Sequence, residues 1–376
     1  MIIPRFIKSD ILQKLQPQKA VIIYGPRQVG KTTLIKEILQ DIQEEYMFVS
    51  GEDRAVSPWL SSGSIETLKT YLGAKRFLVV DEAQKISEIG LNFKLLIDHI
   101  TGIKILATGS SSFELASHIG EPLVGRKWEF LLYPIAQLEL SSLESRHETE
   151  ARLESRLIYG SYPDVINSAD VSEKREILNA IVDQYLYKDL LMFDEIRKSQ
   201  KIIDILKLIA FQIGKEVSLH EIALQTHING RTVEKYLDLL EKAFVVKRVR
   251  GFSRNARKEI SKNSRYYFYD NGVRNAIINN MNDLKTRNDV GQLWENYLFM
   301  ERMKKQEYQK IYANNYFWRT YDQKEIDLIE ERDGKLFGYE FKWGAKAVKA
   351  PQAWRAMYKE AKYEAIHKDN YLEFIT

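Results

Sequence analysis

The chain has 376 residues, a formal net charge of +4 and no cysteine. A chain of this length usually contains two or three domains, each large enough to bury its own apolar core. The lack of cysteine excludes disulfides, thiolate zinc sites, iron–sulfur clusters and cysteine nucleophiles. No apolar run approaches the ~20 residues of a membrane span, and the first ten residues, MIIPRFIKSD, lack a signal-peptide core. We therefore expect a cytoplasmic protein with no membrane partner.

Short runs rich in Val, Ile and Leu alternate with helical stretches in the first 135 residues. Strands are expected over residues 20–24, 46–50, 77–80 and 103–108, and helices over residues 32–43, 64–72 and 91–101. Apolar strands that alternate with helices indicate a parallel sheet covered on both faces. The predicted fold class is therefore α/β, with a three-layer nucleotide-binding domain over residues 1–135.

The remaining chain divides into three further predicted parts. Residues 136–197 are charged and helical, which indicates a lid or connector. Residues 198–284 have the pattern of a winged helix-turn-helix, with Ser218 as the cap of its second helix and a wing that begins near residue 243. Residues 285–376 are α+β, with one helix, three strands and a turn at Asp333 and Gly334.

The strongest local signal is the sequence GPRQVGKT between a predicted strand and a predicted helix. It fits the phosphate-binding loop G-x-x-x-x-G-K-[ST], in which backbone N–H groups and the helix N-terminus surround the phosphates. Lys31 is expected to reach the β- and γ-phosphates, and Thr32 to bind magnesium. The predicted nucleotide-binding residues are Gly25, Pro26, Arg27, Gln28, Val29, Gly30, Lys31, Thr32, Thr33 and Ser110.

Two further strand ends supply polar groups to this site. The run FLVVDEAQ ends a buried strand with Asp81, expected to hold the magnesium, and Glu82, expected to act as the general base. The alternative is a pair of acids that begins a surface turn. The run ILATGS ends with Thr108 and Ser110, either of which would sense the γ-phosphate, although ordinary turn chemistry explains these residues equally well.

Together, YGPRQVGKTTL, FLVVDEAQ and ATGSSS resemble an AAA-type ATPase of the additional-strand, catalytic-glutamate class. The stretches LVGRKWEFLLYPI, YGSYPDV and YLYKDLL narrow this resemblance to bacterial and archaeal ATPases that carry a C-terminal domain of unknown function. The resemblance implies ATP and Mg²⁺ as cofactors and a C-terminal domain with a restriction-nuclease-like fold. It also implies that Arg126 acts as a finger on a γ-phosphate, in cis or from a neighbouring subunit of a homo-oligomer, although a surface ion pair would explain it as well.

An acidic pattern in the last 90 residues is similar to the PD-(D/E)XK nuclease core. Glu340 and Lys342 lie two apart on a predicted strand and so face the same side, with Asp327 on the preceding strand and Glu295 on the helix before both. The three carboxylates are predicted metal ligands, and Lys342 would activate water. The alternatives are a cross-strand charge pair and a degenerate core that only binds DNA.

Basic residues follow the third helix of the predicted winged helix. Residues 247–265 contain eight basic residues and one acid. DNA, duplex or branched, is the predicted partner. The alternatives are a solvated charged hairpin and an interdomain interface in which the winged helix packs against protein. The predicted contacts are Arg231 and Lys235 on the helix and Arg248, Arg250, Arg254, Arg257 and Lys258 on the wing. The aromatic run at residues 266–269 is expected to alternate between core and surface positions of a strand.

These patterns favour a magnesium-dependent ATPase that couples ATP hydrolysis to DNA engagement or processing. The alternative is a signalling or scaffold ATPase whose nuclease-like domain is catalytically silent and binds protein.

Overall fold

The computed structural model describes residues 1–110, 123–187, 199–253, 263–320, 322–344 and 348–376. These residues form two compact units. The N-terminal unit comprises Ile2–Pro134 together with Lys242–Phe244, and the C-terminal unit comprises Met1, Ile135–Glu241 and Val245–Thr376.

The N-terminal unit is built on a five-stranded sheet with the order β2-β3-β4-β1-β5. All four pairings are parallel, as predicted for apolar strands that alternate with helices. Side chains on both faces of β1, β3 and β4 are buried, which explains why these strands are continuous apolar runs. The strands are β1 Lys19–Tyr24, β2 Met47–Ser50, β3 Phe77–Asp81, β4 Lys104–Gly109 and β5 Lys127–Leu131.

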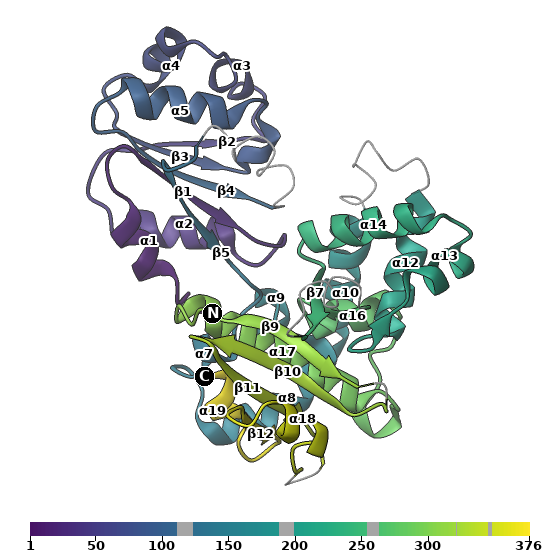
Figure 1. Ribbon diagram of the computed structural model, residues 1–376. Coiled ribbons are helices and arrows are strands. Elements are labelled where there is room, and N and C mark those ends of the chain that lie inside the picture. The colour runs from purple at the N-terminus through teal and green to yellow at the C-terminus, as the bar shows by residue number, and fades with distance from the viewer. Residues whose placement is uncertain (111–122, 188–198, 254–262, 321, 345–347) are drawn as a thin grey trace. The chain divides into compact units, whose positions relative to one another are not determined.

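Helices cover both faces of this sheet, so the α/β prediction for this part is confirmed (Figure 1). The chain moves across the sheet in one direction from β1 to β2 and returns through β3 to β4, and right-handed crossovers then place the helices on opposite faces. One side carries α1 Lys8–Lys14 and α2 Lys31–Gln40. The other side carries α3 Ser57–Leu60, α4 Ile65–Leu72 and α5 Ile89–His99.

Helices make up the first part of the C-terminal unit. Several of them begin with side-chain caps, among them Ser145, Asp170, Ser218 and Asp270. Ser218, the predicted cap, accepts a hydrogen bond from the Glu221 N–H. The helices are α7 Gln137–Leu140, α8 Arg146–Tyr159, α9 Pro163–Asn167, α10 Val171–Ala180, the π-helical turn Ile181–Leu186, α12 Ser199–Phe211, α13 Leu219–Thr226, α14 Gly230–Lys242 and α16 Asn271–Ile277.

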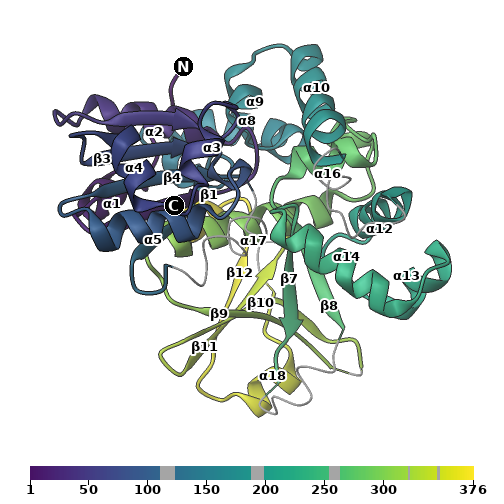
Figure 2. The same cartoon turned by 90° about the horizontal axis from the view of Figure 1, so that it is seen from above.

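A seven-stranded sheet with the order β12-β11-β10-β9-β7-β8-β6 runs through the C-terminal unit (Figure 2). Parallel pairing of β7 with β9, with Gly251 beside Phe317, joins the strands of the predicted wing to those of the predicted nuclease-like region. The predicted boundary between residues 284 and 285 therefore does not separate two independent sheets. The strands are β6 Glu216–Val217, β7 Val246–Gly251, β8 Ser264–Phe268, β9 Asn314–Arg319, β10 Glu325–Arg332, β11 Lys335–Phe341 and β12 Lys362–Ile366.

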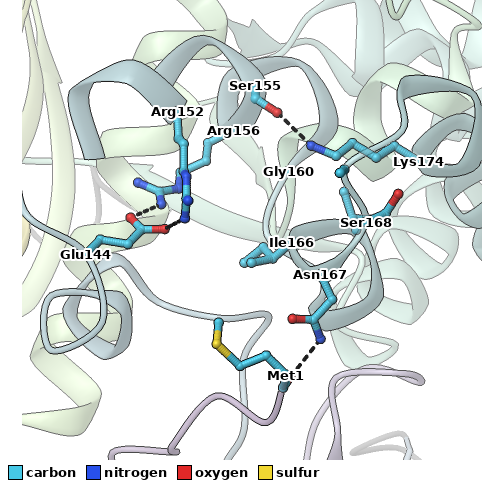
Figure 3. Close-up of a pocket in the computed structure, with 12 residues that line it drawn as sticks. Met1, Glu144, Arg152, Ser155, Arg156, Gly160, Ile166, Asn167, Ser168 and Lys174 are labelled. Carbon is cyan, nitrogen blue, oxygen red and sulfur yellow. Dashed lines mark hydrogen bonds and ion pairs between the residues drawn. The ribbon is translucent and has the colours of Figure 1, made fainter. Parts of the chain in front are cut away.

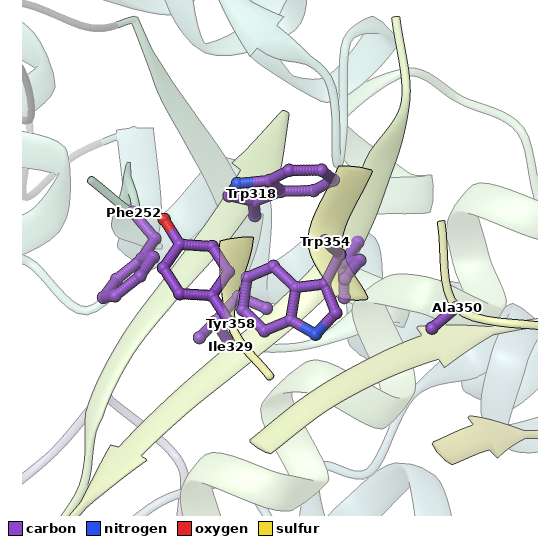
Figure 4. Close-up of a cluster of buried hydrophobic side chains, with 7 residues drawn as sticks. Phe252, Trp318, Ile329, Ala350, Trp354 and Tyr358 are labelled. Atoms are coloured by element: carbon purple, nitrogen blue, oxygen red, sulfur yellow. The ribbon is translucent and has the colours of Figure 1, made fainter. Parts of the chain in front are cut away.

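Side-chain alternation gives this sheet two different faces. Trp318 and Ile329 pack with Trp354 of α18 Gln352–Met357 in an aromatic cluster on one face (Figure 4). Glu330, which follows Ile329 on β10, receives two hydrogen bonds from Arg302 of α17 Val290–Tyr308, at 2.6 and 3.0 Å. A buried carboxylate is costly unless it is paired in this way. α19 Tyr371–Ile375 packs beside α17.

Two local predictions for this sheet have different outcomes. Asp333 and Gly334 form the turn between β10 and β11, both with positive φ (50° and 74°), as a two-residue hairpin requires.

The expected alternation of Tyr266–Tyr269 between core and surface positions is wrong, because all four side chains are buried. β8 lies between β7 and β6 in the sheet rather than at its edge, and Tyr267 stacks on Phe299 of α17 with ring centroids 4.1 Å apart.

Candidate functional site

The predicted phosphate-binding loop follows β1 directly and ends at Thr32, the second residue of α2. Gly25 has φ 151°, and a Cβ atom at this position would lie 2.1 Å from the Leu132 carbonyl oxygen, so only glycine fits. Gly30, with φ 93°, is the N-cap of α2. The loop therefore presents backbone N–H groups and a helix N-terminus toward the end of the sheet, which is how proteins bind phosphates.

Side chains within and beside the loop hold its shape. The buried Lys31 ammonium donates to the carbonyl oxygens of Gly25 and Pro26, at 2.8 and 2.7 Å. Arg5 donates to the carbonyl oxygens of Val29 and Tyr133, both at 2.6 Å. Arg5 was not among the predicted site residues, because nothing in the sequence near it marks a contact 24 residues away. Of the other predicted nucleotide contacts, Arg27 is half-buried, and Gln28 and Thr33 are exposed.

The predicted magnesium ligands Thr32 and Asp81 lie side by side. The Thr32 hydroxyl donates a 2.8 Å hydrogen bond to Asp81 Oδ2. The other carboxylate oxygen of Asp81 accepts from the Thr108 hydroxyl and, at 3.2 Å, from the Glu82 N–H. Three elements that are separate in the sequence, α2, β3 and β4, thus bring their oxygen atoms to one edge of the sheet.

Gln84 links Glu82 to Ser110. Its side-chain N–H₂ group donates to Glu82 Oε2 at 2.5 Å and to the Ser110 hydroxyl at 2.8 Å. The Gln84 amide oxygen is buried without a hydrogen-bond partner among the described residues. Gln84 was not among the predicted site residues. Its position two residues after Glu82 is the one signal in the sequence that could have identified it. In the structure it lies in the short 3₁₀ turn Ala83–Lys85. Gln84 therefore connects Ser110, one of the two predicted γ-phosphate sensors, to Glu82, the predicted general base.

Arg126 lies at the opposite edge of the sheet from the loop. β5 runs parallel to β1 with Lys127 beside Ala20, so Arg126 is level with Lys19, the first residue of β1, whereas the loop follows the end of β1. Five residue steps of a strand separate the two edges by about 17 Å. Arg126 pairs instead with Asp98 of α5 at 2.8 Å. The prediction that Arg126 contacts the γ-phosphate of its own chain is therefore wrong, and a role in trans stays a prediction.

In the C-terminal unit, two of the four predicted nuclease residues, Glu295 and Asp327, lie beside a buried arginine. Lys342 pairs with Glu340 at 2.6 Å, and Asp327 accepts a hydrogen bond from the Phe341 N–H at 2.8 Å. Arg265 is 3% exposed. Its guanidinium lies 3.4 Å from Glu295, 3.6 Å from Asp327 and 2.7 Å from Glu325.

Burial and mutual repulsion disfavour negative charge in this acidic cluster. Burial, with the charge of Asp327 as a further cause, raises the pKa of Glu295 to about 8 and that of Glu340 to about 7. Within the described parts of the chain, no group of three or more His, Asp or Glu side chains is arranged to hold a metal ion. The predicted ligand set of Glu295, Asp327 and Glu340 is thus not brought together as a metal site, and Arg265 supplies the positive charge there.

The predicted DNA contacts are partly exposed. Arg231 and Lys235 lie on the exposed side of α14, and Arg250 is exposed on β7. Arg248 is half-buried and donates to the Ser264 hydroxyl at 2.9 Å. Arg254, Arg257 and Lys258 lie outside the described residues.

The loop geometry predicts that Gly25→Ala abolishes nucleotide binding. The added methyl group would clash with the Leu132 carbonyl and force the loop open. Gly291→Ala is the matched control, because a Cβ atom there meets nothing within 4 Å. Titration with a fluorescent nucleotide should show binding for the control alone, and unchanged affinity in a folded Gly25→Ala variant would contradict the loop assignment.

Comparison with known protein families supports an ATPase assignment for the N-terminal region. Residues 17–141 match the family described as "AAA domain". Residues 150–284 and 290–372 match two families described as domains of unknown function, DUF8612 and DUF4143. Of the described helices, none is long and apolar enough to cross a membrane.

The relatives that match most of this chain carry the name uncharacterized protein. A Mycobacterium tuberculosis protein is 24% identical over 339 residues, 89% of this chain and 72% of the relative. One from Methanocaldococcus jannaschii is 26% identical over 316 residues, 79% of this chain and 69% of the relative. The replication factor C large subunit of Methanosarcina mazei is 30% identical over 71 residues, 18% of this chain and 12% of that protein.

Two solved structures share a distant similarity. A signal-transduction ATPase with a tetratricopeptide repeat sensor from Pyrococcus horikoshii has a TM-score of 0.32 at 15% identity, covering 81% of this chain and 46% of that one. The RuvB Holliday junction branch migration motor of Thermotoga maritima has a TM-score of 0.34 at 18% identity, covering 66% and 90%. At these scores neither similarity carries an argument. The family matches and the geometry together identify an AAA-type domain over residues 17–141, followed by two regions that match families of unknown function.

Proposed function

We propose that this protein is a magnesium-dependent ATP hydrolase. The observation that carries the proposal is the 2.8 Å hydrogen bond between Thr32 and Asp81, with Glu82 at the same sheet edge. A hydroxyl at the start of α2 and a carboxylate at the end of β3 are the pair that phosphate-loop ATPases use around magnesium.

The residues present fit a magnesium–nucleotide complex. Thr32 and Asp81 offer hard oxygen donors, the type that Mg²⁺ prefers. The loop amides and the N-terminus of α2 would bind the phosphates, and Lys31 would leave the Gly25 and Pro26 carbonyls to contact the β- and γ-phosphates. Magnesium bound there would neutralise charge on the phosphate oxygens.

Glu82 would act as the general base. Its carboxylate would accept a proton from the attacking water. Gln84 holds this carboxylate through the same amide group that contacts Ser110, so a γ-phosphate that engages Ser110 would pull Gln84 away from Glu82. In this proposal Gln84 is a positioning residue that reports nucleotide state to the base. Arg126, if it contacts a γ-phosphate, would contact that of a neighbouring subunit.

The proposal predicts different defects for two substitutions. Glu82→Gln should retain ATP binding and lower the hydrolysis rate by about 10²–10⁴-fold, the usual contribution of a general base. Lys31→Ala should lose binding itself. Phosphate release and nucleotide binding, measured side by side, separate these outcomes. Glu45→Gln, an exposed carboxylate on the same unit, is the control, and normal turnover by Glu82→Gln would disprove the base assignment.

We further propose that the C-terminal unit engages DNA. Helices α12, α13 and α14 followed by antiparallel β7 and β8 have the order of a winged helix. In such a module the third helix enters the major groove, and Arg231 lies in the first turn of α14. The exposed Lys247 and Arg250 on β7 would contact phosphates.

DNA binding is tested by fluorescence anisotropy with duplex and branched DNA at low salt and at about 150 mM salt. Arg231→Ala and Arg250→Ala should each weaken binding and reduce its salt dependence, because each removes a phosphate or base contact. Arg54→Ala, an exposed arginine on the other unit, should not change it. Lack of binding at low salt, together with an ATPase rate unaffected by DNA, would contradict this part of the proposal.

A second candidate function is a signalling or scaffold ATPase whose nuclease-like region is silent. The observation in its favour is Arg265, whose guanidinium reaches Glu295, Asp327 and Glu325. A permanent cation among these carboxylates would exclude the divalent ion that phosphodiester cleavage needs. The unit would then bind its partner without cutting it.

This candidate predicts that the protein does not cut DNA in the presence of Mg²⁺ or Mn²⁺. Supercoiled and branched substrates should remain intact, and the Asp327→Asn variant should give the same result as the unaltered chain. Manganese binding, followed by electron paramagnetic resonance, should be the same for both proteins. Metal-dependent cleavage that disappears in Asp327→Asn would disprove the silent assignment.

A further inference from the structure

A pocket of about 410 Å³ lies within the helical part of the C-terminal unit (Figure 3). Its walls come from α8, from α9 with the loop that follows it, and from the first turns of α10. The volume falls within the range of pockets that hold small molecules. Neither the proposed ATPase site nor the acidic cluster contributes a residue to it.

The pocket contains three cationic side chains and one carboxylate. Arg152 pairs with Glu144 at 2.6 Å, and Arg156 pairs with the other oxygen of the same carboxylate. Lys174 reaches into the pocket from α10. With the two arginines sharing a single negative charge, the lining carries two positive charges in excess.

Lys174 is the cation with no acidic partner. Its ammonium donates to the Ser155 hydroxyl at 3.1 Å, and no carboxylate within the described part of the chain forms an ion pair with it. Burial lowers the pKa of Lys174, and the charges of Arg152 and Arg156 lower it further. A lysine held close to two arginines at a pocket wall is in a position that an added anion would stabilise.

We propose that this pocket binds a small molecule through a compact oxyanion group, a phosphate or a carboxylate. The group would lie against Lys174 and the Arg152 guanidinium, which donates to Glu144 through Nη1 and is 55% exposed. The planar fork of arginine matches both oxyanions. Ser155 and Asn167 at the wall add neutral hydrogen-bonding groups, and Val165 and Ile166 provide apolar surface for the remainder of the molecule.

The site is tested in the full chain carrying Lys31→Ala, so that the phosphate loop of the N-terminal unit does not bind the probes. The probes are inorganic phosphate, glycerol 3-phosphate and succinate, followed by isothermal titration calorimetry and ligand-observed NMR. At least one probe should bind. Lys174→Met should weaken that binding about tenfold, the loss expected for one charge-assisted hydrogen bond. Arg175→Met, the neighbouring and exposed cation of α10, should leave it unchanged.

The probes also distinguish the two oxyanions. Tighter binding of glycerol 3-phosphate identifies a phosphate ester as the ligand class, and tighter binding of succinate identifies a carboxylate. Circular dichroism establishes that each variant is folded, and Ser155→Ala replaces Lys174→Met if the latter is not. Absence of binding for all three probes, or equal affinity in the Lys174 and Arg175 variants, would overturn the proposal.

Discussion

The candidate ATPase site depends on one constraint, the order in which parallel strands lie in the sheet. β1, β4 and β3 are neighbours, so their carboxyl ends meet at one edge, although Tyr24 and Gly109 are 85 residues apart in sequence. The Thr32–Asp81 and Thr108–Asp81 hydrogen bonds are the direct result of this order. The end of the loop at Thr32, the acidic strand end at Asp81 and the hydroxyl of Thr108 therefore lie together at one edge of the sheet.

The sequence was sufficient for those parts of the fold that have a local physical signature. Buried parallel strands are continuous apolar runs, and the glycines of the loop are required by its backbone, so the amino-acid pattern alone was enough to assign residues such as Gly25 and Asp81. Contacts between distant residues have no such signature. Only the tertiary structure shows the hydrogen bond from Arg5 to the Val29 carbonyl of the loop and the hydrogen bond from Gln84 to the Ser110 hydroxyl. The position of Arg126 was missed for the same reason, because the register of β5 against β1 decides which edge it occupies.

The C-terminal unit shows the limit of local patterns more clearly. The basic stretch at residues 247–265 was predicted to contain DNA contacts, yet Arg265 at its end is buried among carboxylates. Arg265 lies on β8, which pairs with β7 on one side and β6 on the other and packs against α17. The same position of β8 explains why the four aromatic residues at 266–269 are all buried. A charge count cannot distinguish a solvated arginine from one that neutralises an acidic core.

The central claim is that the loop, Thr32 and Asp81 form a magnesium–triphosphate site. It is tested most directly by calorimetric titration of ATP into the full-length protein, with magnesium and then with an excess of chelator. The account predicts clear binding with magnesium and much weaker binding without it, because the oxygens of Thr32 and Asp81 would bind the ion that neutralises the phosphates. An absence of binding heat in both titrations, or an affinity for ATP that does not depend on magnesium, would contradict it.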